Sequence, residues 1–180
     1  MAATYREVKV ASAILDYQLN WAAWLTAQSN DTISAVDWVV TGATEGTNSN
    51  TTTTATVRIS AGTAGTLATA KCTITTAAGL IDVRSIELSI VASLEATQVV
   101  KAPGATMAIP APTWSDLGGD TISTYSWSAA AGLTIASGGS TATVKVSGGT
   151  AGVDYALTCA IVSSSGQEDS RVITVQVRDR

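Results

Sequence analysis

Histidine and phenylalanine are absent from the 180 residues, and charged residues make up only 13% of the chain. Without histidine, the chain lacks the side chain that serves most often as a general base and as a metal ligand. The ten Lys and Arg residues are scattered singly and the net charge is −4, so no basic face is available for phosphates. These absences argue against an enzyme and against nucleic acid as a partner.

Long apolar runs are missing as well. The longest runs fall far short of the roughly 20 residues that a membrane-spanning helix needs. The chain starts Met-Ala-Ala-Thr-Tyr-Arg-Glu, without the basic and then apolar pattern of a signal peptide. We therefore expect no membrane partner and no export signal.

Motifs for metals, cofactors and nucleophiles are also missing. The aspartates lack the dense spacing of a calcium loop. The glycine-rich segment 148–152 has no following lysine, and the serines at 163–165 have neither a nucleophile elbow nor a histidine beside them. We expect no cofactor, no metal and no catalysis.

Serine and threonine are abundant, with 19 Ser and 28 Thr. Threonine and valine suit pleated strands, so the composition favours an all-β protein.

The chain contains a tandem repeat. Residues 55–65 (ATVRISAGTAG) recur at 142–152 as ATVKVSGGTAG, with eight of eleven positions identical. The offset of 87 also pairs Cys72 with Cys159; upstream, an offset of 89 pairs Trp38 with Trp127, and one of 90 pairs Trp24 with Trp114.

Each repeat shows short alternating apolar segments with turn residues between them. In the first repeat the predicted strands cover 14–19, 33–40, 55–60, 67–76 and 80–91, and 42–54 is expected to be a polar loop. Five to seven short strands in about 90 residues are typical of an immunoglobulin-like sandwich. We therefore predict two tandem immunoglobulin-like β-sandwich domains, residues 1–92 with an N-terminal arm and residues 93–180.

Matched residues in the two repeats are interpreted as structural. Trp38 and Trp127 lie mid-strand and are predicted to fill the cores. Cys72 and Cys159 are single cysteines in separate domains, so we expect buried free thiols rather than a disulfide, as suits a reducing cytoplasm. The pairs Asp82 with Arg84 and Asp169 with Arg171 recur before the last strand; a repeated ion pair or strand anchor is favoured over a ligand clamp.

Unmatched residues are the candidates for a partner interface. Residues 1–12 have no clear counterpart, so Tyr5, Val8 and Val10 belong either to an arm that pairs with a neighbour's sheet edge or to a frayed end. Trp21 also lacks a counterpart, because the offset of 90 leads to Ala111. Local packing and a partner contact are equally good explanations for Trp21.

The order of motifs in residues 14–90 resembles one known family. The motifs are Asp-Tyr-x-Leu-x-Trp-x-x-Trp-Leu at 16–25, Asp-Thr-Ile at 31–33 with Trp38, Thr-Ala-Thr-Val at 54–57, Gly-Thr-Ala-Gly at 62–65, Ile-Thr-Thr-x-x-Gly at 74–79 and Arg-Ser-Ile at 84–86. In this order they resemble the phage fiber-tail adaptors of tailed-bacteriophage virions. The second repeat is similar in a weaker form, with Pro110 and Pro112 in the opening motif.

The resemblance implies a non-enzymatic virion protein that is made and folded in the host cytoplasm. It implies that the chain binds other phage virion proteins of tail, neck, fiber or capsid, and that it is multimeric in the particle. Family members usually have one such domain, whereas here it is duplicated. The alternative is a capsid decoration protein or a surface carbohydrate-binding module.

Overall fold

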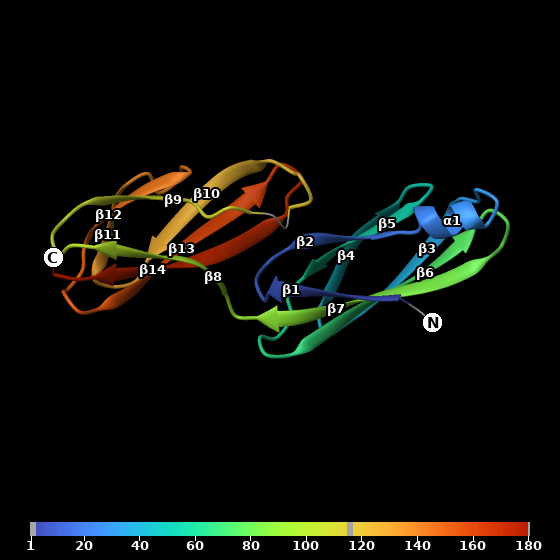
Figure 1. The fold of residues 1–180 in the computed structure, drawn as a ribbon, viewed down its shortest axis with the longest axis horizontal. Helices are drawn as coiled ribbons and strands as arrows, with labels where there is room; N and C mark the ends of the chain where they lie inside the picture. Colours follow the sequence, from blue (N-terminus) through green and yellow to red (C-terminus); the bar gives the residue numbers. More distant parts are fainter. Residues whose placement is uncertain (1–2, 115–116, 180) are drawn as a thin grey trace. The chain divides into compact units, whose positions relative to one another are not determined.

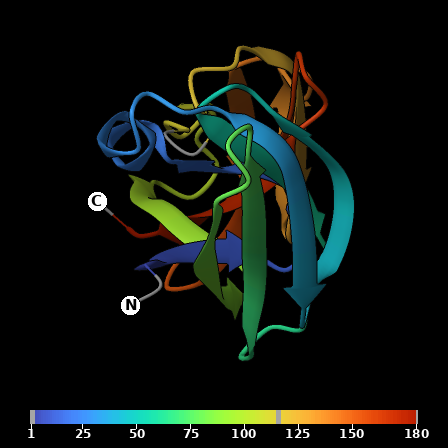
Figure 2. The ribbon, with the colours of Figure 1, turned by 90° about the vertical axis from the view of Figure 1, so that its right-hand side faces the viewer.

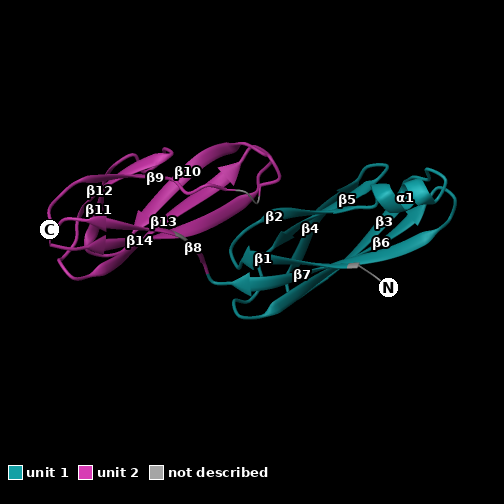
Figure 3. Ribbon diagram, in the orientation of Figure 1, with its two compact units in different colours: residues 1–92 teal, residues 93–180 magenta. Residues whose placement is uncertain are grey.

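The computed structural model describes residues 3–114 and 117–179. The chain divides into two compact units, residues 1–92 and 93–180 (Figure 3). Both units are built almost entirely of strands (Figure 1). None of the helices in the described part of the chain is long and apolar enough to cross a membrane.

The described part of unit 1 contains seven strands and one short helix, α1, which Figure 2 shows as a blue coil beside the strands. In chain order the elements are β1 (Ala3–Val10), β2 (Leu15–Asn20), α1 (Ala22–Ala27), β3 (Ile33–Thr41), β4 (Thr44–Asn50), β5 (Thr54–Ser60), β6 (Leu67–Thr76) and β7 (Ile81–Val91). They form one sheet in the order β1-β7-β6-β3 and a second in the order β2-β5-β4.

Unit 2 repeats this arrangement strand for strand. Its strands are β8 (Leu94–Lys101), β9 (Met107–Pro110), β10 (Ile122–Ala129), β11 (Leu133–Ser137), β12 (Thr143–Gly148), β13 (Asp154–Ser163) and β14 (Glu168–Val177). The sheets have the orders β10-β13-β14-β8 and β11-β12-β9. Two sheets of four and three strands in each unit are the immunoglobulin-like architecture, and the predicted all-β tandem fold is confirmed.

Alternation of side chains places the core of each unit between its two sheets. In β6, Ala70, Cys72 and Ile74 are buried, as the sequence predicts, and they share one cluster with Val57 and Ile59 of β5. Successive residues of a strand point to opposite faces, so Lys71 and Thr73 between them lie on the outer face of the sheet. In unit 2, β13 shows the same alternation.

The first strand of each unit pairs with the last strand of the same unit. The pairing of β1 with β7 is parallel and runs from Ala3↔Arg84 to Val10↔Val91. In unit 2, β8 pairs with β14 in parallel. The interpretation of residues 1–12 as an arm is therefore wrong: strand β1 completes the four-stranded sheet of its own unit.

The polar stretch 42–54 is also structured, against expectation. Residues 44–50 form β4, an edge strand whose seven residues are all exposed. It pairs with β5 through a register shift between Glu45 and Asn48. The sequence of such a strand shows no apolar alternation that would predict it, because neither of its faces is buried.

Candidate interaction site

A tryptophan, an arginine and an aspartate meet at the start of the last long strand in unit 1. The Trp21 indole N–H donates to the Asp82 carboxylate (2.8 Å), and the Arg84 guanidinium carbon lies 4.8 Å from the centre of the Trp21 ring. Arg84 also donates to Asp82 (3.3 Å) and to the backbone carbonyl of Asn20 (2.6 Å). Because Trp21 is 0% exposed, a partner contact at this residue is ruled out, and its role is to join α1 to β7.

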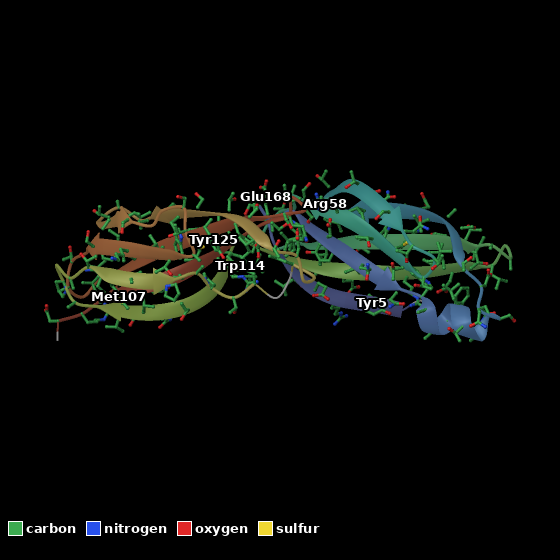
Figure 4. All side chains as sticks on the ribbon, turned by 90° about the horizontal axis from the view of Figure 1, so that it is seen from above. Tyr5, Arg58, Met107, Trp114, Tyr125 and Glu168 are labelled. Carbon is green, nitrogen blue, oxygen red and sulfur yellow. The ribbon has the colours of Figure 1, made fainter. Side chains whose placement is uncertain are left out.

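The same cluster recurs in unit 2 around Trp114. The Arg171 guanidinium carbon lies 5.0 Å from the ring centre of Trp114, and Arg171 and Asp169 approach to 3.8 Å. Trp114, which Figure 4 labels, is thus the counterpart of Trp21. The alignment of Trp114 with Trp24 is therefore wrong, because the stretch from Trp21 to Asp31 is four residues longer than the stretch from Trp114 to Asp120.

The matched core residues are register partners on neighbouring strands of the same sheet. Trp38 of β3 pairs with Cys72 of β6, and Trp127 of β10 pairs with Cys159 of β13. Both tryptophans are at most 7% exposed, and both cysteines are free and fully buried. Burial raises the pKa of Cys72 to about 12, and that of Cys159 to about 11, so neither thiol is suited to act as a nucleophile.

The residues of β1 divide between surface and interior. Tyr5, labelled in Figure 4, is 43% exposed, and Val8 is 49% exposed. Val10 is 1% exposed, so the expected partner contact at Val10 is wrong: its side chain belongs to the interior of unit 1. Of these three residues, only the side chains of Tyr5 and Val8 are accessible to another protein.

Each unit contains a buried lysine whose ammonium group binds backbone carbonyls, and the sequence patterns did not predict it. The Lys9 ammonium donates to the carbonyls of Val10 (3.0 Å) and Ala61 (2.8 Å), and Lys101 donates to those of Ala102 (2.9 Å) and Gly148 (2.7 Å). Both ammonium groups thereby hold the end of a central strand against the first strand of the unit. The two lysines stand 92 residues apart, so the offsets of 87, 89 and 90 do not align them.

An aspartate anchors the hairpin between the last two strands of each unit. The Asp31 carboxylate accepts from the backbone N–H of Thr32 (2.8 Å) and of Ala78 (3.3 Å). Asp120 accepts from the N–H of Thr121 (2.8 Å) and of Ser165 (3.0 Å), and from the hydroxyl of Ser164. Hydrogen bonds lower the pKa of both carboxyls. The main cause is the hydroxyl of Thr76 at Asp31 and the hydroxyl of Ser163 at Asp120, and the backbone N–H groups add to the effect.

The described residues hold no cluster of metal ligands, and one hollow on unit 2 is small for a ligand. They include no group of three His, Cys, Asp or Glu side chains that would hold a metal ion. A hollow of about 250 Å³ lies between β8 and β9 and is lined by Val100, Lys101, Ala102, Ala105, Thr106 and Met107. Ligand pockets generally measure about 300–1,000 Å³, so the exposed surfaces of the strands and hairpins are the better candidates for binding.

A family model described as podophage GP4 fiber-tail adaptor protein gp77 matches the chain in two segments, residues 9–89 and 101–176. The first segment lies within unit 1 and the second within unit 2. No curated protein matches the chain.

Solved structures with tandem immunoglobulin domains match the chain along most of its length. The titin domains z1z2, solved in complex with telethonin, are 10% identical; the match covers 99% of this chain and 94% of that one, with a TM-score of 0.33. The N-terminal Ig1-2 module of the Drosophila receptor protein tyrosine phosphatase DLAR is 12% identical, with coverage of 97% and 95% and a TM-score of 0.35. At such scores the fold assignment rests on the strand order of each unit.

Proposed function

Because the chain belongs to the podophage GP4 fiber-tail adaptor family, we propose that it joins the tail or neck of a phage particle to fibers or to other virion proteins. Membership makes the chain a phage structural protein; its particular partners are the proposal. The observation that carries it is the match over both units. An adaptor that contacts two partners gains from two similar domains, since each can carry a different surface.

The proposed role is binding without catalysis. The chain has no histidine, and both cysteine thiols are buried with raised pKa values. A chain with one free buried cysteine in each unit is suited to folding in the reducing host cytoplasm before it enters the virion. We further propose that it is present in several copies in each particle, as a symmetric tail or neck requires.

The exposed side chains of β1 are one proposed contact. Tyr5 and Val8 lie on an edge strand of unit 1, and an edge strand offers unpaired backbone groups to a partner. The matched control is Val100, the counterpart of Val8 on β8, which is 40% exposed. Loss of partner binding on Tyr5→Ser with Val8→Thr, but not on Val100→Thr, is the expected result.

The stoichiometry of this chain in purified virions tests the proposed function. An adaptor is expected in a small copy number, far below that of the major capsid protein, and particles made without the chain are expected to lack fibers. A copy number near that of the capsid protein would support a decoration protein instead. Normal fibers on particles that lack the chain would contradict the adaptor role.

A further inference from the structure

The hairpin between β6 and β7 exposes apolar side chains that the equivalent hairpin of unit 2 lacks. Leu80 is 40% exposed and Ile81 is 66% exposed, and Ala77 and Ala78 beside them are exposed as well. Figure 1 places this turn (green) at the same end of unit 1 as α1. At the offset of 87, the corresponding residues of unit 2 are Ser164, Ser165, Gln167 and Glu168.

The hairpin does not need these apolar residues to form. Its turn is made by hydrogen bonds from Thr76 N to Leu80 O (2.9 Å) and from Gly79 N to Thr76 O (3.0 Å). In unit 2 the same bonds run from Ser163 N to Gln167 O (2.8 Å) and from Gly166 N to Ser163 O (3.1 Å). Since polar residues make the same turn, the leucine and isoleucine of unit 1 have another role.

The core does not explain these residues either. Gln167, the counterpart of Leu80, is 4% exposed, and its side-chain amide donates to the carbonyl of Leu117 (3.4 Å). Unit 2 thus buries a polar residue at the position where unit 1 exposes an apolar one. Exposed apolar groups that cluster on a surface mark a binding site more often than they mark a packing defect.

The hairpin is held in one conformation before any partner arrives. The Asp31 carboxylate fixes the N–H of Ala78, and the N–H of Ala77 donates to the carbonyl of Thr32 (2.9 Å). The Thr76 hydroxyl accepts from the N–H of Leu80 (3.0 Å). A tip that is already ordered loses little conformational entropy when it docks.

The polar groups beside the tip are already hydrogen-bonded or paired. Ile81 pairs with Thr75, and Thr75 pairs with Ala35 on the next strand. The charged Asp31 carboxylate next to the tip accepts from backbone N–H groups. An apolar centre beside satisfied polar groups is common in protein interfaces, and it suits an apolar partner surface.

We propose that Leu80 and Ile81 dock into an uncharged apolar pocket on another virion protein, and that only unit 1 makes this contact. This inference rests on the proposed adaptor function and names the surface that carries it. The contact depends on shape and apolarity, because the tip offers two branched aliphatic side chains, and the Asp31 carboxylate beside it is already hydrogen-bonded to backbone N–H groups. Unit 2 is left to hold a different partner through other residues.

The test replaces Leu80→Gln and Ile81→Glu together, which gives unit 1 the residues that unit 2 already carries in the same hairpin. The full chain is supplied in host cells to a phage that lacks its gene, and the amount in purified particles is measured. We expect incorporation to fall at least tenfold, while circular dichroism and the denaturation midpoint stay as in the unchanged protein.

The matched control is Leu67→Asp. Leu67 is 66% exposed, as Ile81 is, and its counterpart in unit 2 is Asp154. This variant is expected to be incorporated normally. Normal incorporation of the double variant, or an equal loss with Leu67→Asp, overturns the inference.

Two further outcomes separate this inference from the proposed function. If the unchanged chain is absent from particles, the adaptor function itself fails, and the inference fails with it. If sedimentation shows that the purified unchanged chain self-associates and that the double variant does not, the occupant of the site is a second copy. That result overturns the assignment to another virion protein while leaving the adaptor function intact.

Discussion

The indole N–H of Trp21 donates to the carboxylate of Asp82 at 2.8 Å, and this bond ties the residue before α1 to β7, which lies between β1 and β6 in the sheet of unit 1. We predict that Asp82→Ala destabilises the protein by about 1–3 kcal/mol, because a buried donor loses its acceptor. Chemical denaturation measures the loss. The control is Asp37→Ser, an exposed aspartate on the same sheet whose counterpart is Ser126; a loss of similar size there would contradict the prediction.

The two core tryptophans differ in one hydrogen bond. The Trp127 N–H donates to the carbonyl of Thr141 (2.8 Å), whereas no described residue accepts from the buried N–H of Trp38. Replacement by phenylalanine removes similar volume at both sites, so Trp127→Phe is expected to cost about 1 kcal/mol more than Trp38→Phe. Replacement of either by alanine should cost about 3–5 kcal/mol. If urea denaturation shows equal losses of unfolding free energy for the two phenylalanine variants, the hydrogen bond of Trp127 does not contribute as predicted.

Ala61 has a backbone φ of 56°, in the left-handed region that favours glycine, and its counterpart Gly148 has a φ of 79°. An L-residue with a side chain is strained there by about 1–2 kcal/mol, and part of the gain from glycine is offset in the unfolded chain. We predict that Ala61→Gly stabilises unit 1 by about 0.5–1 kcal/mol. The reverse change, Gly148→Ala, should destabilise unit 2, since an added Cβ would lie 2.8 Å from the carbonyl oxygen of Gly132. Thermal denaturation of the two variants shows whether the stability of each rises or falls as expected.

The anchoring aspartates predict a loss of stability in acid. Their pKa values in the folded protein lie below the ordinary value of 3.8 because hydroxyl and N–H groups donate to the charged carboxylates. Their contribution is therefore complete above about pH 5 and falls as the pH drops through 3.8 towards the lower folded pKa. Asp120→Asn and Asp31→Asn should flatten the stability profile between about pH 5 and pH 2. A profile as steep as that of the unchanged protein would count against the anchor role, and Asp37→Asn is the control.

The two units are proposed to be independently folding domains. Each has its own buried core and pairs its first strand with its own last strand. The isolated segments 1–92 and 93–180 are expected to unfold cooperatively in urea, with m-values that add up to that of the whole chain. If either segment is unfolded in buffer, the domain proposal is wrong.

Sequence patterns predicted the strands with a buried face and missed those without one. The alternation in β5, β6 and β7 is produced by burial, so it is visible in the order of apolar and polar residues alone. Strand β4 has no buried face, and Tyr5 and Val8 are exposed on an edge strand whose inner residues include a lysine. The partner of β1 is β7, about 80 residues further along the chain, so a local window does not contain it, and β4 shows no alternation although its partner β5 follows directly.

The repeat found the aspartate and arginine pairs but misassigned one tryptophan. Residues 14–24 and their counterparts lie before loops of different length, so a fixed offset of 90 paired Trp24 with Trp114. The structure pairs Trp21 with Trp114 through the arginine that stacks on each ring. The apolar hairpin tip escaped notice because it emerges only when residues 77–81 and 164–168 are compared by exposure rather than by identity.

The parallel pairing of first and last strands also decides how each unit responds to mechanical load. The chain enters unit 1 at the start of β1 and leaves at the end of β7, and these points lie at opposite ends of the paired strands. Tension along the chain therefore shears all the ladder bonds from Ala3↔Arg84 to Val10↔Val91 together, rather than peeling them apart one by one. Strands β8 and β14 meet the same load in unit 2, and only Ala92 and Ser93 separate the two ladders. Each unit is thus expected to resist force best when it is pulled along its paired first and last strands.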